Sequence, residues 1–405
     1  MKKLFLLLSF SFFLSIFSFS QEYGWVDLSE NIPTQGASLL TDIFFIDENE
    51  GWVTTSSLLE IYHTTNGGLT FEIQTVQMPA HQIQMLDKNR GYAGGQSGTV
   101  FYTNNGGKNW NLINGFLPST IRGLTFPAES DTGFICGDSG WVGKIDSTHI
   151  FDMEKLVIAN LYAISFPTKD EGWVCGGAVI RHYTNIQWVA DQNYPFEGYN
   201  AMYMVNPTHG YAAGDGGMII HTSDGNNWTK QKYEPPTIND IYFTDETHGW
   251  AVTIHYINYT TDGGSNWMLD SIPSLGNGDL VSVFFLNESL GFVSGYKKDE
   301  ALNSSPAFFK YMEISGVAEG QKNTLSFEVY PNPAKSVISL QFAAFSRQSS
   351  VFEVYDLNGR KLLEKQIPAG AENIEIDVSH LKNGVYFCRL LTEKYSATQK
   401  LIIQK

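Results

Sequence analysis

The 405-residue sequence is poor in cysteine, in basic residues and in long hydrophobic runs. Its three cysteines are too few for the disulfide framework of small secreted domains. Lysine and arginine number 26 against 42 aspartates and glutamates, a formal net charge of −16. A field of this sign repels nucleic-acid phosphates and anionic membranes, so we expect neither as a partner. Excess acidic residues are also ordinary on a solvated surface.

The one long hydrophobic run lies at the N-terminus. It covers residues 4–19, follows a basic start at residues 1–3 and ends in the small-residue triplet 18–20. It is shorter than the roughly 20 residues that a membrane-spanning helix needs, and no basic segment follows it. This pattern is typical of a secretory signal peptide. We therefore predict a signal peptide over residues 1–20, cleavage before Gln21 and no transmembrane segment in the mature chain.

A glycine followed by an aromatic residue recurs seven times, at steps of 38 to 42 residues. Short alternating strands at a period near 40 are typical of a β-propeller, whose blades have about 40–45 residues in the best-known family. Each repeat is therefore predicted to be one four-stranded sheet. We call the seven glycines the marker glycines; with their aromatic neighbours they are Gly51-Trp52, Gly91-Tyr92, Gly133-Phe134, Gly172-Trp173, Gly210-Tyr211, Gly249-Trp250 and Gly291-Phe292.

Further positions of the repeat carry structural predictions. Residues eight and six positions before the marker glycines are apolar, with the period-two spacing of a strand, which we place innermost in the blade. Three positions after the marker glycine, repeats three and four have Cys136 and Cys175, where other repeats have mostly small residues. Buried free thiols in a tight slot are the simpler interpretation, and a disulfide between the two blades is the alternative. Cys388 is predicted to be a core residue.

The last repeat and the residues after it define the domain boundaries. The seventh repeat lacks a clear fourth strand, and residues 25–28 resemble the strand that ends other repeats, so we predict that they close a seven-bladed propeller over residues 21–313. Residues 314–324 are polar and small and are predicted to be a linker. Residues 325–405 alternate in short strands and predict a small Ig-like β-sandwich, which makes the fold class all-β. Residues 21–320 hold 13 basic and 34 acidic side chains, so the acidic charge belongs to the propeller.

A recurrent turn ends the third strand of repeats one, two and six, at residues 64–71, 103–110 and 260–267. Its Asn or Asp can cap backbone N–H groups, its glycines permit positive φ, and its last residue is a large aromatic that fills the blade. This turn resembles the Asp-box or BNR repeat. With the marker glycines, it makes the propeller region similar to the family of photosystem II assembly factors and, more loosely, to sialidase and xyloglucanase propellers. The resemblance implies a fold, on which unrelated functions occur; the photosystem role is tied to a basic patch, and this propeller is acidic.

Four blocks of the C-terminal region are similar in order and spacing to the type A sorting domain of the type IX secretion system. The resemblance implies that the type IX secretion machinery is a partner and that the domain is an address, usually removed at the outer membrane. The mature propeller would then be secreted or attached to the outer cell surface. An ordinary adhesive sandwich is the alternative. The blocks are Tyr330-Pro331-Asn332-Pro333, residues 354–360, Gly384-Val385-Tyr386 and Lys400-Leu401-Ile402.

Motifs for catalysis and metal binding are weak. The histidines of the propeller occur singly rather than at metal-ligand spacing, and we predict no metal, no cofactor and no catalytic residue. A sialidase needs three convergent arginines, whereas those of the propeller lie on unrelated parts of the repeat: Arg90, Arg122 and Arg181. Glycoside hydrolysis needs two carboxylates, for which Asp138, Asp215 and Asp240 are candidates near strand ends, although solvated carboxylates are the simpler interpretation.

The candidate ligand-binding residues lie ten positions before the marker glycines, or the equivalent, where each innermost strand begins. In a propeller they would surround the mouth of the central channel. Their types vary, as in a binding site on a repeat scaffold and also as in unconstrained loop edges. We predict a secreted protein that binds an extracellular protein or glycan; the alternatives are a glycoside hydrolase-like enzyme and an assembly factor for envelope complexes. We call these the rim residues: Thr41, His81, Arg122, Tyr162, Asn200 and Asn239, with Val281 in the seventh repeat.

Overall fold

The computed structural model divides the chain into two compact units, Met1–Ser315 and Gly316–Lys405. The predicted signal peptide and all but the first residue of the predicted linker lie outside the described residues. No helix within the described part of the chain has the length and apolar character needed to cross a membrane. The structure describes residues 23–33, 39–190, 194, 198–233, 236–270, 272, 275, 278–298, 303–314, 327–342, 350–356, 360–368, 373–391 and 396–405.

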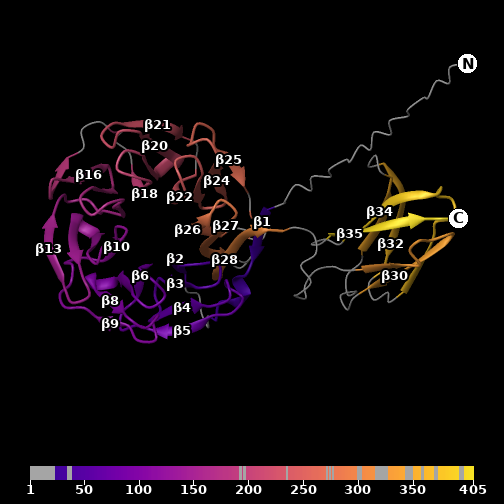
Figure 1. Cartoon of the computed structure of the whole chain (residues 1–405), viewed down its shortest axis with the longest axis horizontal. Helices are drawn as coiled ribbons and strands as arrows, with labels where there is room; N and C mark the ends of the chain where they lie inside the picture. The colour runs from indigo at the N-terminus through magenta and orange to yellow at the C-terminus, as the bar shows by residue number, and fades with distance from the viewer. Residues whose placement is uncertain are drawn as a thin grey trace, which may run out of the picture. The chain divides into compact units, whose positions relative to one another are not determined.

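The first unit contains seven four-stranded antiparallel sheets arranged in a ring, a seven-bladed β-propeller (Figure 1). Blades one to three consist of β2 (Leu40–Phe45), β3 (Gly51–Thr55), β4 (Glu60–Thr64) and β5 (Glu72–Thr75); β6 (Ala80–Met85), β7 (Gly91–Gly95), β8 (Val100–Thr103) and β9 (Asn111–Leu112); β10 (Ile121–Thr125), β11 (Gly133–Gly137), β12 (Trp141–Ile145) and β13 (Ile150–Lys155).

Blades four to six repeat the same strand order. Four short 3₁₀ turns have bounds within the described residues. The turns are η1 (Ser29–Asn31), η2 (Gln96–Gly98), η3 (Asp138–Gly140) and η4 (Asp215–Gly217). The strands are β14 (Ala163–Ser165), β15 (Gly172–Gly176), β16 (Val179–Thr184) and β17 (Gln187–Ala190); β18 (Tyr199–Met204), β19 (Gly210–Gly214), β20 (Met218–Thr222) and β21 (Trp228–Tyr233); β22 (Ile238–Phe243), β23 (Gly249–Thr253), β24 (Ile257–Thr260) and β25 (Met268–Asp270).

The seventh blade combines both ends of the propeller. It contains β26 (Asp279–Asn287), β27 (Leu290–Lys298) and β28 (Ser304–Glu313), and its fourth strand is β1 (Tyr23–Asp27). Strand β1 pairs with β28 from Tyr23 opposite Glu313 to Asp27 opposite Phe309. The indole N–H of Trp25 also donates a 2.8 Å hydrogen bond to the carboxylate of Asp270 in blade six. The N-terminal strand therefore closes the ring.

Stacking across the seams between blades explains the glycine–aromatic repeat. Gly51 pairs with Phe45, and a Cβ atom on this glycine would lie 2.4 Å from the Phe45 ring. The same ring stacks at 3.6 Å on Phe292, the marker aromatic of blade seven. Tyr211 stacks likewise at 3.7 Å on Phe243 of the following blade. The glycine admits a large apolar side chain from its own blade, and the aromatic covers that of the next.

The cysteines are buried and unpaired in the described chain, as the simpler interpretation predicted. Cys136 Sγ donates to the Leu161 carbonyl at 3.8 Å, and Cys175 Sγ donates to the Ala201 carbonyl at 3.6 Å. Each of these weak hydrogen bonds crosses to the next blade. Leu161 lies just before the innermost strand β14, and Ala201 lies within the innermost strand β18. A small side chain with a donor suits this slot between blades.

The second unit has one three-stranded and one four-stranded sheet around a shared core. The core includes Ile338, Phe352, Ile376 and Leu401, which come from both sheets. The side chain of Asn332 donates to the Lys400 carbonyl and accepts from Ile402 N–H, which fixes the last strand. The strands are β29 (Phe327–Tyr330), β30 (Val337–Phe342) and β33 (Asn373–Asp377), then β32 (Lys361–Ile367), β31 (Ser350–Tyr355), β34 (Gly384–Leu391) and β35 (Ser396–Ile403).

Candidate functional site

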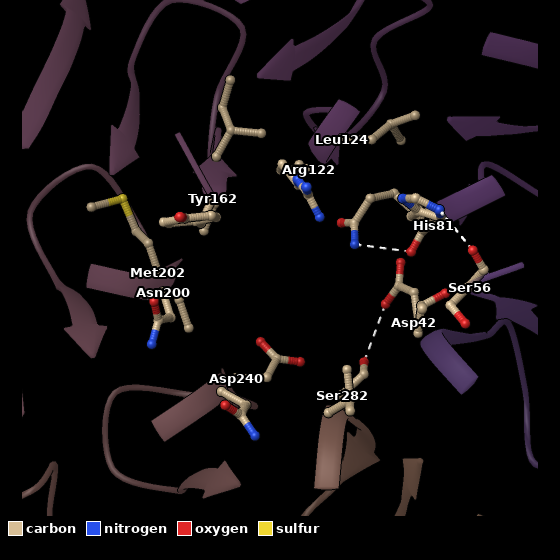
Figure 2. A pocket seen from close by; sticks show the side chains of 18 of the residues that line it. Asp42, Ser56, His81, Arg122, Leu124, Tyr162, Asn200, Met202, Asp240 and Ser282 are labelled. Carbon is tan, nitrogen blue, oxygen red and sulfur yellow. Dashed lines mark hydrogen bonds between the residues drawn. The ribbon is translucent and has the colours of Figure 1, made fainter. Parts of the chain in front are cut away.

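The innermost strands of the seven blades surround a cavity of about 600 Å³, which we call the channel cavity. All seven rim residues line it, although neighbouring members are about 40 residues apart in sequence. Figure 2 shows His81, Arg122, Tyr162 and Asn200 around the open centre. The structure therefore brings the predicted residues together, and their role in ligand binding stays a prediction.

A β-bulge at the start of the innermost strand presents the rim residue in six of the seven blades. The ladder register shifts around Thr41 in blade one, His81 in blade two and Arg122 in blade three. It shifts equivalently around Asn200, Asn239 and Val281. A bulged residue leaves the regular ladder and its side chain is re-aimed, which is why bulges are frequent beside binding sites.

The two rim asparagines each link their own blade to the next. Asn200 Nδ2 donates to the Ile238 carbonyl at 3.2 Å, and Asn239 Nδ2 donates to the Leu280 carbonyl at 2.6 Å. The amide nitrogen is thus engaged by the fold. The amide oxygens have no hydrogen-bond partner among the described residues, so each leaves an acceptor for a ligand.

The basic side chains of the rim are neutralised or uncharged. Arg122 donates to both carboxylate oxygens of Asp138, at 2.9 and 3.0 Å. This bidentate pairing raises the pKa of Arg122 above its ordinary value. His81 contacts the Ser56 carbonyl through Nε2 at 3.2 Å, and burial lowers the pKa of its ring. Among the described residues that line the cavity, Arg122 is the one permanent cation, and it already has a carboxylate partner.

Two carboxyl groups that line the channel cavity belong to Asp42 and Asp240. Asp240 was identified as a candidate from the sequence, and Asp42 was missed. Asp42 accepts hydrogen bonds from Ile83 N–H of blade two at 2.9 Å and from the Ser282 hydroxyl of blade seven at 3.2 Å. Asp240 accepts from Val283 N–H of blade seven at 2.9 Å. Burial raises the pKa of Asp42 to about 7, with repulsion from Asp240 adding to it, and raises that of Asp240 to about 6.

The signal that identifies Asp42 is the position nine before the marker glycine. The bulge turns this position toward the cavity together with the rim residue before it. The remaining carboxylate candidates lie elsewhere: Asp138 in η3 pairs with Arg122, and Asp215 belongs to η4 rather than to the cavity lining. The described residues hold no group of three His, Cys, Asp or Glu side chains arranged to ligate a metal.

Comparison with known proteins identifies the C-terminal sorting domain and supports the propeller fold. Residues 328–404 match the family of secretion system C-terminal sorting domains. This match indicates that the chain is exported by type IX secretion and is secreted or attached to the cell surface. No curated protein matches the chain.

Solved propellers resemble the first unit at low sequence identity. A structure of YCF48 bound to D1 peptide is 16% identical, with a TM-score of 0.55, and covers 72% of this chain and 94% of its own. YCF48 from Cyanidioschyzon merolae is 17% identical with the same TM-score, and covers 72% and 99%. The RRP9 WD40 repeats are 10% identical with a TM-score of 0.59, and cover 71% and 97%. These similarities show the propeller fold.

Proposed function

We propose that the protein is a secreted propeller that binds an extracellular protein segment or glycan in the channel cavity. The observation that carries this proposal is the row of bulges: six blades present their rim residue into one cavity, and the six side chains are of five different types. A rigid ring that presents varied polar groups suits recognition. The peptide complex of YCF48, a propeller of similar fold, supports a polypeptide ligand.

Array binding tests this proposal. The purified full chain is applied to glycan and peptide arrays beside Arg122→Ala and Arg90→Ala variants. Both arginines are partly exposed and paired with carboxylates, but Arg90 pairs with Asp87 and Asp131 outside the channel cavity. We expect Arg122→Ala to lower the affinity for the ligand at least about tenfold, because a charge-assisted hydrogen bond is lost. Arg90→Ala should leave the affinity unchanged. If Arg122→Ala and a variant of another part of the cavity lining, Ala163→Leu, both bound the ligand as the wild type does, the ligand would lie outside the cavity.

The Asp42 and Asp240 carboxyls favour one second candidate, an enzyme that acts on extracellular polysaccharide. Both line the cavity and both have a raised pKa, which suits a general acid. Release of reducing ends from a polysaccharide panel, abolished by Asp240→Asn, would support it. Because the two carboxyls also link blades through backbone N–H groups, their environment has a structural explanation, and binding is the better-supported function.

A further inference from the structure

The channel cavity has two chemically different walls. Nine positions before the marker glycine, or at the equivalent position of blade three, blades three to five have Gly123, Ala163 and Ala201, which are small and apolar. Leu124 and Met202 extend this wall (Figure 2). The other four blades have hydrogen-bonding side chains at that position: Asp42, Gln82, Asp240 and Ser282.

The polar wall accepts hydrogen bonds and has negative formal charge. Asp240 and Asp42 face the open centre in Figure 2. Asp279, at the start of β26, also lines the cavity and accepts from the Tyr296 hydroxyl. The lining residues that the structure describes include three carboxyl groups against one arginine, and Asp138 neutralises that arginine. A ligand group that donates hydrogen bonds and carries positive charge therefore complements this wall.

Building on the proposed function, we propose that the channel cavity takes a primary ammonium at the end of an aliphatic chain, as in a lysine side chain of a polypeptide ligand. The methylene stem packs on the apolar wall, to which Leu124 and Met202 contribute side chains. The ammonium donates toward Asp42, Asp240 and the free amide oxygen of Asn239. A lysine combines these two surfaces in one side chain.

Titration of the polar wall makes this binding depend on pH. The titratable groups facing it are Asp42, Asp240, Asp279, His81, Arg122, Tyr162 and Tyr296. Burial raises the pKa of Asp42 to about 7 and that of Asp240 to about 6. An ammonium favours their ionised forms, so its affinity rises as pH increases from about 5 to about 8, and binding releases protons.

Fluorescence polarisation with labelled pentapeptides tests the proposal on the full chain. The probes are Gly-Ser-Lys-Ser-Gly and two matched peptides in which acetyl-lysine or norleucine replaces the lysine. We expect the lysine peptide to bind at least about tenfold tighter than either matched peptide, since both lack the charge. Asp240→Asn and Ala163→Leu should each weaken it by a similar factor, whereas the exposed outer-strand variant Glu154→Gln should not. Two variants on opposite walls keep the test decisive if one fails to fold.

Several outcomes overturn the inference. Equal binding of the three peptides, no binding of any of them, or equal weakening by Glu154→Gln would each exclude a lysine site in the cavity. The array experiment then separates the two proposals. A lysine-free ligand weakened by Arg122→Ala would keep the channel cavity as a binding site and discard the ammonium. Absence of any ligand weakened by Arg122→Ala, Asp240→Asn or Ala163→Leu would discard both.

Discussion

At the scale of single residues, the carboxyl of Asp42 joins three blades. Asp42 belongs to blade one, accepts from Ile83 N–H in blade two and accepts from the Ser282 hydroxyl in blade seven. Its pKa of about 7 exceeds the unfolded value, near 3.9. A raised folded pKa contributes stability that is fully present below about pH 4 and is lost as pH rises through 7. Ionising Asp42 thus weakens the fold.

Replacing Asp42 by Asn should remove this pH dependence. Between about pH 5 and pH 8 we expect the free energy of unfolding of the wild type to fall by about 2–3 kcal/mol relative to Asp42→Asn, because one titrating carboxyl contributes up to about 1.4 kcal/mol per pH unit. Urea denaturation followed by tryptophan fluorescence measures it, since all nine tryptophans lie in the first unit. Asp131→Asn, an exposed carboxyl outside the cavity, is the control. If the free energy of unfolding changed equally with pH in the wild type and in Asp42→Asn, the raised pKa of Asp42 would be contradicted.

The buried thiols lead to a second prediction at this scale. Burial raises the pKa of Cys136 and of Cys175 well above ordinary values, which keeps both thiols protonated and unreactive. We expect no reaction with a thiol reagent in the native protein and three reactive thiols per chain in denaturant. A count of one in denaturant without reductant would instead show that Cys136 and Cys175 form a disulfide.

The sequence predicted the rim but only part of the cavity wall, for a geometric reason. In a regular strand, adjacent side chains point to opposite faces, so a rim residue and the next residue cannot share one surface. The bulge around Thr41 breaks this rule and places Asp42 on the cavity as well. Bulges depend on pairing between strands, and sequence periodicity carries no direct sign of them.

At the scale of elements, a recurring turn explains two aspartates that looked functional in the sequence. With the glycine that precedes each of them, the turns η2, η3 and η4 have the sequences Gly-Gln-Ser-Gly, Gly-Asp-Ser-Gly and Gly-Asp-Gly-Gly. Their last glycines have φ between 70° and 79°, and a Cβ atom on Gly98 would lie 1.8 Å from the Leu117 carbonyl oxygen. Asp138 and Asp215 therefore occupy the first position of a structural turn, and Gln96 occupies the same position in η2. The Gly-X-X-Gly pattern that the three repeats share is the sequence signal of this turn.

The Asp-box turn of blade six makes the turn chemistry testable. Buried Thr260 donates to Asp262 Oδ1 at 2.9 Å and accepts from Gly264 N–H at 2.8 Å, whereas its neighbour Thr261 is exposed. Thr260→Ala leaves a buried N–H without its partner and should lower the free energy of unfolding by about 1–3 kcal/mol. Thr261→Ala should change it by less than about 0.5 kcal/mol. Urea denaturation compares the two; equal effects would mean that the turn is not stabilised through this hydroxyl.

At the scale of the whole molecule, closure of the ring depends on a strand remote in sequence from its partners. The repeat pattern allows seven blades with or without an N-terminal contribution, and the similarity of residues 25–28 to other fourth strands indicated the closed arrangement. The structure pairs β1 with β28 and packs Trp25 against Phe285 and Tyr311. What no repeat reveals is the hydrogen bond from Trp25 to Asp270, because it joins an element outside the repeats to blade six.

Deleting β1 should therefore weaken the whole propeller, because β1 completes the blade in which the two ends of the ring meet. We compare chains that begin at Tyr23 and at Ile32. The shorter chain exposes the β28 edge and loses the Trp25 contacts with Phe285 and Asp270. Losing a packed tryptophan costs about 3 kcal/mol, and each kcal/mol shifts the Tm of a domain this large by about 2 °C, so we expect Tm to fall by at least about 5 °C. Size-exclusion chromatography should also show association through the open edge. An unchanged Tm with monomeric elution would mean that the contacts between blades hold the ring without β1.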